Sequence, residues 1–253
     1  MKIAVITGAS SGMGREFVLQ LDKAEHFDEI WVIARRKERL EALADEVKAP
    51  LRAISLDLTK PESIETYRAL LEEAKAEVAV LVNGSGFGKF RKFEEASLQD
   101  CCDMVDLNSK SLMAMTYVTL PFMGKGGRIY QLGSLSSFQP VPYIGVYGAS
   151  KAFVLSFSRA LNVELKPRGI RSMAVCPGWV ATEFFDHAVS DDSVTYYNKI
   201  YQPDDVVRTA LKDMKKGKDV SIHGLQVRAQ VLGVKLLPHK LVMKIWMKQQ
   251  KHA

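Results

Sequence analysis

A tyrosine and a lysine at helical spacing are the residues of this 253-residue chain best placed to do chemistry. Tyr147 and Lys151 are four positions apart, so on a helix they share one face and lie one turn from each other. A lysine ammonium there favours the ionised phenol, which predicts a tyrosine pKa lowered from about 10 toward neutral pH. Such a tyrosine can serve as a general acid or base. Ser134, upstream of the tyrosine, supplies a hydroxyl that can orient a carbonyl or alcohol beside it.

The elements that must position these residues follow from the alternation of short apolar runs with longer helical patterns. Several of the runs are apolar almost throughout, as parallel strands are when helices cover both of their faces. The alternation predicts an α/β fold: a doubly wound, Rossmann-type parallel sheet of about seven strands, in a single domain over residues 1–253. The predicted strands are Ile3–Ile6, Ile30–Ile33, Leu51–Leu56, Val78–Val82, Arg128–Leu132, Arg171–Val175 and Val220–Ile222. The predicted helices span 12–24, 36–48, 61–76, 97–120, 144–166 and 203–216.

Composition limits the function classes. The chain has 47% hydrophobic and 25% charged residues and a formal net charge of +6, which is ordinary for a globular protein. No helix collects arginines and stacking aromatics, so we expect no nucleic-acid partner. Three cysteines without framework spacing predict a reducing compartment, and no Cys or His stands at ligand spacing around them, so we expect no metal site. The apolar N-terminal run is too short for a signal peptide and no stretch is long enough to span a membrane, so we expect a cytoplasmic location.

A glycine-rich loop, Thr7–Gly14, follows the first predicted strand and opens the first helix. Glycines there allow a tight turn and a close approach of the backbone to a pyrophosphate, which the helix N-terminus attracts. The strand–loop–helix context is the one that dinucleotide binding requires. The loop residues predicted to bind the nucleotide are Gly8, Ser10, Ser11, Gly12, Met13 and Gly14.

The end of the second predicted strand indicates which nucleotide binds. A chain built for NAD would carry Asp or Glu near Ala34, whereas this chain continues with Arg35 and Arg36. A guanidinium binds a 2′-phosphate, so the expected cofactor is NADP(H). The alternative is that both arginines are solvated residues at the start of a helix, and for Arg36 the two interpretations are about equally good. Asp57, after the third strand, could bind the adenine ring or cap the next helix.

The glycine-rich loop after the fourth strand begins with Asn83 and Gly84. It lies where open α/β sheets bind ligands, so both residues are predicted to bind the cofactor; a flexible turn is the alternative.

Taken together, these motifs resemble the short-chain dehydrogenase/reductase family in its single-domain branch, over residues 1 to about 222. The resemblance implies catalytic roles for Ser134, Tyr147 and Lys151, and makes Asp57 the adenine-contacting acid. It implies that Asn108 supports an ordered water and the lysine. It also implies that a loop positions the nicotinamide through Pro177, Gly178, Val180 and Thr182.

Two departures from the family pattern stand out. The family usually has Asn-Asn-Ala-Gly after the fourth strand, where this chain has Gly84 at the second position, which predicts a looser loop. The serine motif usually reads Ser-Ser, and here Gly133 precedes Ser134. Spacing to the tyrosine keeps Ser134 as the catalytic candidate, ahead of Ser136 and Ser137.

The expected activity is NADP(H)-dependent interconversion of a ketone or aldehyde and an alcohol. Tyr147 is expected to donate the proton, Ser134 to hydrogen-bond the substrate oxygen, and Lys151 to bind the nicotinamide ribose, while Asn108 anchors a water that refills the proton. The alternatives are a non-catalytic NADP(H)-binding regulator, which has no need of a proton donor, and an epimerase or dehydratase, for whose substrate domain the chain has little room.

The aromatic segment 183–202 follows the nicotinamide loop and is predicted to form a substrate lid. Its rings suit a hydrophobic or ring-bearing small-molecule substrate such as a steroid or bile acid. Packing of the lid against the body explains these aromatic residues equally well. A sugar, polyol or acyl-thioester ketone stays an alternative substrate. The aromatic residues in question are Phe184, Phe185, Tyr196 and Tyr197, with Phe87, Phe138 and Tyr143 as further candidates.

Two further segments predict contacts with other surfaces. Residues 225–253 form a C-terminal extension in which Pro238–Lys251 is amphipathic, with Leu241, Val242, Ile245 and Trp246 on one side and lysines on another. We favour a helix docked on protein over one lying on a membrane. The family resemblance implies a homodimer or homotetramer joined through the helices of 97–120 and 144–166.

Overall fold

The computed structural model describes residues 1–189 and 193–250, and its centre is a seven-stranded sheet in the order β3-β2-β1-β4-β5-β6-β9. Every neighbouring pair in the sheet is parallel. The strands are β1 Lys2–Thr7, β2 Glu29–Ala34, β3 Leu51–Ser55, β4 Glu77–Asn83, β5 Arg128–Leu132, β6 Arg171–Val175 and β9 Val220–Ser221. The predicted α/β class, strand number and doubly wound topology are therefore confirmed.

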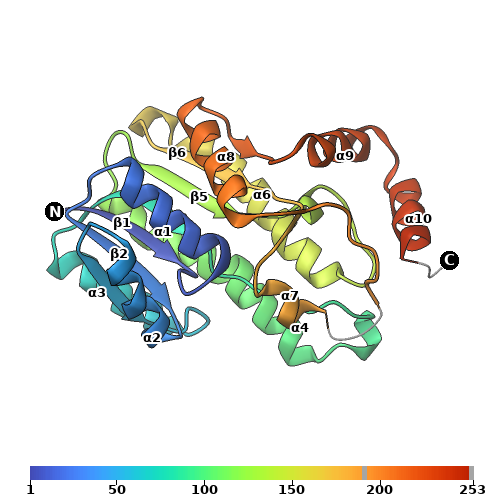
Figure 1. Ribbon diagram of the computed structural model, residues 1–253, viewed down its shortest axis with the longest axis horizontal. Coiled ribbons are helices and arrows are strands. Elements are labelled where there is room, and N and C mark those ends of the chain that lie inside the picture. The colour runs from blue at the N-terminus through green and yellow to red at the C-terminus, as the bar shows by residue number, and fades with distance from the viewer. Residues whose placement is uncertain (190–192, 251–253) are drawn as a thin grey trace.

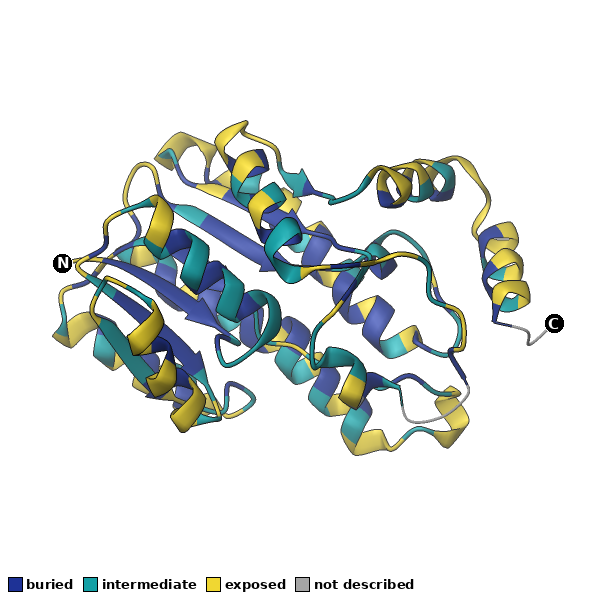
Figure 2. Cartoon of the chain, viewed as in Figure 1, coloured by how far each residue is buried: buried dark blue, intermediate teal, exposed yellow. Residues whose placement is uncertain are grey.

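Helices cover both faces of the sheet (Figure 1). The helices of the described chain are α1 Gly12–Ala24, α2 Lys37–Glu41, α3 Pro61–Glu73, α4 Leu98–Val105, α5 Leu112–Thr119, α6 Gly145–Glu164, α7 Phe184–Ala188, α8 Pro203–Lys215, α9 Leu225–Leu236 and α10 His239–Gln249. Alternate residues of β1 point to opposite faces: Ala4 and Ile6 pack with α1, α2 and α8, while Ile3 and Val5 pack with α3, α5 and α6. The central strands are buried, the edge strand β3 is only partly so, and the outer faces of the helices are exposed (Figure 2).

Two predicted helices are interrupted. The helix expected over 36–48 ends at Glu41 and continues as a 3-10 turn, Ala42–Glu46. The helix expected over 97–120 contains a π-helical turn, Asp106–Ser111, between α4 and α5. Such turns widen a helix locally and often lie at functional sites. Four further 3-10 turns, Phe93–Glu95, Leu120–Phe122, Leu135–Phe138 and Lys166–Arg168, lie in the connections.

The segment over 183–202 is more regular than expected. It contains α7, and its β8 (Ile200–Tyr201) pairs in parallel with β7 (Trp179–Val180). Residues 190–192 of this segment lie outside the described part of the chain.

Helices α9 and α10 lie at the end of the molecule opposite the N-terminus (Figure 1). Only half of the apolar side predicted for α10 is buried: Val242 and Trp246 pack onto the body, whereas Leu241 and Ile245 are exposed. Lys251, the end of the predicted amphipathic segment, lies outside the described residues. Within residues 1–189 and 193–250, no helix combines the length and apolarity that crossing a bilayer requires.

Candidate active site

Two glycine loops meet backbone to backbone where β1 and β4 end. Gly8 has a positive φ of 69°, and a Cβ there would come within 2.6 Å of the Gly84 carbonyl oxygen. The Thr7 hydroxyl accepts hydrogen bonds from the backbone N–H groups of Gly84 (3.0 Å) and Ser85 (3.1 Å). A Cβ at Gly84 would lie 2.5 Å from the Thr7 carbonyl oxygen. The prediction that Gly84 loosens this loop is therefore wrong, because its missing side chain permits the close contact that fixes the loop.

The six loop residues predicted to bind the nucleotide all line one pocket of about 860 Å³ at the carboxyl edge of the sheet. Helix α1 begins within this loop, at Gly12, so its amino end and the partial positive charge there face the pocket. The pocket therefore offers an anion site at the point where the sequence predicts one.

Arginines border the same pocket at the end of β2. Both Arg35 and Arg36 line it. The Arg36 guanidinium donates to the hydroxyls of Ser10 and Ser11, each at 3.1 Å, and pairs with Glu183 of the lid segment at 2.9 Å. A second arginine, Arg39, also pairs with Glu183. A cationic cradle is thus formed by Arg35, Arg36, Ser10 and Ser11, and the Glu183 carboxylate is the anion that Arg36 holds there.

Asp57 lines the pocket and also orders the turn before α3. Its carboxylate accepts hydrogen bonds from the Thr59 backbone N–H (3.1 Å) and hydroxyl (2.8 Å), and it does not cap α3. Burial pushes the pKa of Asp57 up, but the Thr59 hydrogen bonds and the nearby Arg35 outweigh it and the pKa lies below its ordinary value.

Asn83 lies differently from the position predicted for it. Its side-chain amide donates to the Thr116 hydroxyl (2.9 Å) and to the Gln131 side-chain oxygen (2.8 Å), in the buried layer between β4, β5 and α5. It does not line the pocket. Its side chain holds the end of β4 in place, so the structure gives no support to the predicted contact of Asn83 with the cofactor.

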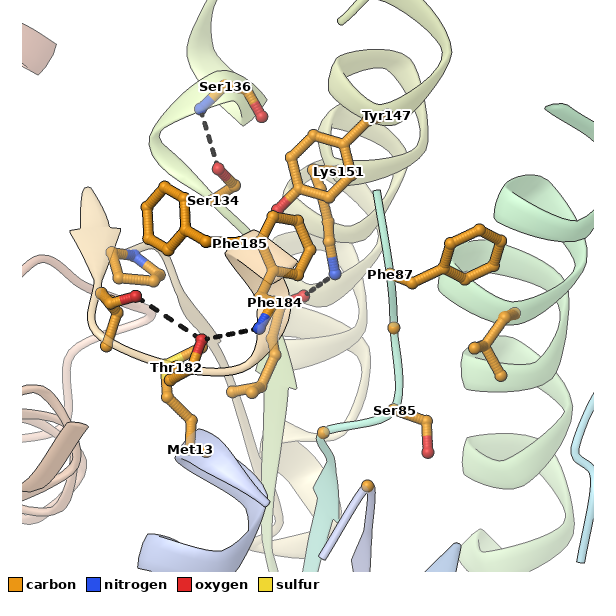
Figure 3. Close-up of a pocket in the computed structure, with 18 of the residues that line it drawn as sticks. Met13, Ser85, Phe87, Ser134, Ser136, Tyr147, Lys151, Thr182, Phe184 and Phe185 are labelled. Atoms are coloured by element: carbon orange, nitrogen blue, oxygen red, sulfur yellow. Dashed lines mark hydrogen bonds between the residues drawn. The ribbon is translucent and has the colours of Figure 1, made fainter. Parts of the chain in front are cut away.

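Tyr147, Lys151 and Ser134 converge on the pocket from two elements (Figure 3). Tyr147 and Lys151 project from α6, and Ser134 begins the 3-10 turn after β5. The Lys151 ammonium donates to the Leu132 carbonyl at 2.7 Å and lies 5.7 Å from the centre of the Tyr147 ring. Ser137 fastens the turn to α6, donating to the Lys151 carbonyl (2.8 Å) and accepting from the Ser134 N–H (3.1 Å).

The protonation states differ from the prediction. Burial raises the pKa of Tyr147 to about 12, against the opposing hydrogen bond with the Ser134 side chain. Burial also lowers the pKa of Lys151 to about 8. The expectation that Lys151 lowers the pKa of Tyr147 is wrong for this pocket, because removal from water disfavours the charged forms of both groups. Tyr147 is consequently a neutral phenol at neutral pH, the form that can donate a proton.

Asn108 lies in the π-helical turn, buried behind the pocket. Its side-chain oxygen accepts from the Phe87 N–H at 3.0 Å, and its amide donates to the Phe87 carbonyl at 2.9 Å and to the Ser150 hydroxyl at 3.1 Å. A Cβ at Gly86 would stand 2.8 Å from the Asn108 oxygen and 3.2 Å from the Lys151 nitrogen. Glycine at position 86 thus lets the loop after β4 pass beside both side chains.

The loop after β6 closes the other side of the pocket. Pro177, Gly178, Val180 and Thr182 all line it. The Thr182 hydroxyl accepts from the Phe184 N–H at 3.4 Å, so Thr182 helps to order the start of α7 (Figure 3). Thr182 also packs against Gly12, where a Cβ would come within 3.0 Å of its methyl group.

Aromatic rings line the wide part of the pocket, though the set differs from the predicted one. Those that line it as expected are Phe87, Phe184, Phe185 and Tyr196. Tyr197, Phe138 and Tyr143 do not line it; Tyr197, for example, packs behind Trp179 with ring centres 5.0 Å apart. Three further aromatic residues line the pocket and were not predicted to do so: Phe90, Trp179 and Trp246. Of these only Trp179 carried a signal, because it stands inside the loop Pro177–Thr182.

The Tyr147 ring is enclosed by two of these aromatics. Its centre lies 5.5 Å from that of Phe90 and 5.5 Å from that of Phe184. Figure 3 shows the Phe184 ring beside that of Tyr147. A Cβ at Gly88 would clash with both phenylalanines, so glycine is needed there. The Tyr147 ring thus stands at an apolar wall from which water is largely excluded.

Comparison with known proteins gives a consistent result. Residues 2–193 match the family model described as short chain dehydrogenase. The NADP-dependent 3-hydroxy acid dehydrogenase YdfG of Escherichia coli O6:H1 is 34% identical over 217 residues, which cover 81% of this chain and 85% of that protein.

Two solved structures are similar over nearly the whole chain. The short-chain dehydrogenase from Sphingobium yanoikuyae in complex with NADPH aligns with a TM-score of 0.80 and 29% identity, covering 96% of this chain and 95% of that one. The bulky-bulky ketone specific alcohol dehydrogenase from Comamonas testosteroni aligns with a TM-score of 0.75 and 26% identity, covering 93% of this chain and 92% of that one.

Proposed function

The chain belongs to the short-chain dehydrogenase/reductase family, and we propose that it interconverts a bulky, hydrophobic ketone and the corresponding alcohol. It is an NADP(H)-dependent oxidoreductase that acts on CH–OH groups. One observation carries the proposal: Ser134, Tyr147 and Lys151 line the same pocket as the glycine loop and the β2 arginines, beside an aromatic wall.

The residues of the pocket fit NADP(H). The amino end of α1 suits a pyrophosphate, and the cradle of Arg35, Arg36, Ser10 and Ser11 suits a 2′-phosphate. The Glu183 carboxylate, held by Arg36, is direct support that this cradle accepts an anion. When bound, the cofactor supplies a hydride to the carbonyl carbon or removes one from the alcohol.

The protein's own groups supply orientation and the proton. In the reducing direction, Tyr147 donates its phenolic proton to the carbonyl oxygen as negative charge develops there. Ser134 donates a hydrogen bond to the same oxygen and so stabilises that charge. The Lys151 ammonium stabilises the tyrosinate that forms, and it binds the nicotinamide ribose. Asn108 keeps the loop after β4 and the π-helical turn in place beside Lys151. Its proposed further role, to anchor the water that returns the proton, rests on the family resemblance.

The aromatic wall supports a ring-bearing substrate, with steroid- and bile-acid-like ketones as the first compounds to try. Phe90 and Phe184 pack against the Tyr147 ring and Trp246 lines the same pocket, and hydrophobic pockets select for apolar, ring-bearing shapes. The ketone specificity stated for the Comamonas testosteroni relative agrees with this choice.

We also infer the organisation of the chain from its packing. Residues 1–253 are proposed to form one domain, with 183–202 as substrate lid and 225–253 as C-terminal extension. Tyr117 of α5 and Val163 of α6 are largely exposed, which supports a homodimer or homotetramer joined through these helices. The described cysteines are all free, which supports the proposed cytoplasmic location.

Substitution of Tyr147 by phenylalanine tests the catalytic proposal. Loss of the proton donor is expected to reduce ketone reduction by roughly 10²- to 10⁴-fold while NADPH still binds. Turnover is followed as NADPH oxidation on a panel of ketones, and Tyr117→Phe, at an exposed tyrosine, is the matched control. Turnover within about tenfold of the unmodified enzyme would contradict the assignment of Tyr147.

A further inference from the structure

The end of the chain holds all of the protein's net charge. Of its 35 Lys and Arg residues, six lie after Asp219, and none of its 29 Asp and Glu residues does. Residues 1–219 are therefore balanced, and the formal charge of +6 belongs to residues 220–253. Five of the six cations are described and exposed: Arg228, Lys235, Lys240, Lys244 and Lys248.

Helix α9 carries an apolar stripe on the face turned away from the protein. Val227, Val231 and Val234 are buried against the body. The stripe on the opposite face, at spacings that share one side of a helix, consists of Leu225, Ala229, Leu232 and Leu236. Its three leucines are 82%, 60% and 75% exposed in chain order. An apolar stripe this exposed marks a contact surface.

Helix α10 repeats the arrangement. Its inner side is anchored by Trp246, whose indole N–H donates to the Pro142 carbonyl at 3.1 Å. On its outer side, Leu241 and Ile245 are 43% and 44% exposed, one turn apart. The row Lys240, Lys244 and Lys248 runs beside them at the same helical spacing. Both helices lie at the same end of the molecule and expose much of their outer surface (Figures 1 and 2).

We propose that the outer faces of α9 and α10 form a docking surface for an anionic lipid bilayer. Leucine and isoleucine side chains insert at the boundary between headgroups and acyl chains, and the lysines and Arg228 bind the anionic headgroups. A second copy of this chain is a poorer occupant, because a two-fold contact through this face would set cations against cations with no acidic residue between them.

The position of the surface connects it to the pocket. Gln230 of α9 and Trp246 and Gln249 of α10 line the pocket from its inner side, while the outer sides of the same helices carry the docking surface. Docking would therefore place the side of the pocket formed by α9 and α10 next to the bilayer surface. The consequence, access for an apolar substrate dissolved in the bilayer, rests on the proposed function; the docking itself does not.

Vesicle co-sedimentation of the full chain tests the proposal. The probes are sucrose-loaded vesicles of phosphatidylcholine alone and of phosphatidylcholine with about one third phosphatidylserine, at low salt and at about 1 M salt. Binding is expected only with phosphatidylserine and is expected to fall in high salt. The triple variant Lys240→Gln, Lys244→Gln, Lys248→Gln is expected to lower the partition coefficient by roughly a hundredfold.

Two further variants separate the contributions. Leu232→Gln with Leu236→Gln removes apolar side chains without changing charge, and it is also expected to lower binding at least tenfold. The matched control, Lys23→Gln with Lys125→Gln and Lys166→Gln, removes three exposed lysines near the amino ends of the strands and is expected to alter binding less than threefold. Unchanged NADPH binding and circular dichroism establish that each variant is folded.

Three results of the vesicle assay would overturn the proposal. They are no binding of the unmodified chain to phosphatidylserine vesicles, equal losses in the control and the α10 variant, and binding unaffected by the leucine substitutions. Light scattering after size-exclusion chromatography tests whether a second copy of this chain binds the surface instead. If the leucine substitutions lower the molecular mass of the particle, the face joins copies of this chain and the lipid assignment fails.

Discussion

Replacement of Glu183 by glutamine should tighten NADPH binding. Glu183 stands at the start of the lid segment and pairs with both Arg36 and Arg39 at the edge of the nucleotide pocket. The hydrogen bonds from Arg39 and Arg36 lower the pKa of Glu183, so the carboxylate is ionised throughout the neutral range. A 2′-phosphate that binds Arg36 must compete with that carboxylate.

The size of the effect follows from the exposure of these groups. The Arg36 and Glu183 side chains are 41% and 39% exposed, and such ion pairs contribute about 0.2–1 kcal/mol each. Loss of two pairs from the free enzyme, about 0.4–2 kcal/mol together, should therefore lower the Kd for NADPH by roughly two- to thirtyfold. The Kd for NADH, which lacks the 2′-phosphate, should change less than about twofold.

Isothermal titration with both nucleotides measures the difference. Asp186→Asn removes one negative charge from α7, close to Glu183 in the chain, and provides the matched control. Unchanged or weaker NADPH binding in Glu183→Gln, or an equal gain for NADH, would refute competition between Glu183 and the phosphate. An equal gain in NADPH affinity in Asp186→Asn would mean that the effect comes from the loss of any nearby negative charge and not from competition for Arg36.

Three other predictions follow from the site. Arg35→Ala should weaken NADPH roughly tenfold or more and NADH little, and equal losses in nucleotide titrations would mean that Arg35 does not bind the 2′-phosphate. The pKa of Lys151 is about 8, and its charged form is lost as pH rises through that value, so kcat for ketone reduction should fall above pH 8. A kcat that stays unchanged up to about pH 10 would contradict the role of the ammonium. Gly8→Ala should lower the free energy of unfolding by at least 1–2 kcal/mol, roughly the cost of left-handed backbone, with the Gly84 contact adding to it. In urea titrations Gly233→Ala, where a Cβ meets nothing within 4 Å, should show no such loss.

The parts of the fold that were predicted correctly depend on local patterns. The strands Arg128–Leu132 and Arg171–Val175 and the helix opening at Gly12 have the predicted bounds, because strand and helix periodicity act over a few neighbouring residues. The interruption of 97–120 by a π-helical turn was not predictable in this way. Its geometry is held by Asn108, which bonds to Phe87, 21 positions away in the chain.

The predicted site residues divide along the same line. Spacing alone placed Tyr147 and Lys151 on one face of α6, and the glycine requirement at Gly8 could be read from the loop itself. The orientation of the Asn83 side chain could not be predicted from the sequence, because its hydrogen-bond partners Thr116 and Gln131 come from other elements.

The sequence by itself determined the order of the elements, the positions of the glycine loops and the placement of Tyr147 and Lys151 on one helix face, because each depends on neighbours along the chain. Tertiary structure decided the charge states of Tyr147 and Lys151, which helical spacing alone predicted wrongly. It also brought Glu183 to Arg36 and Trp246 to the pocket. The physical reason is that desolvation and ion pairing depend on which distant segments exclude water from a group, and only the packed chain fixes those segments.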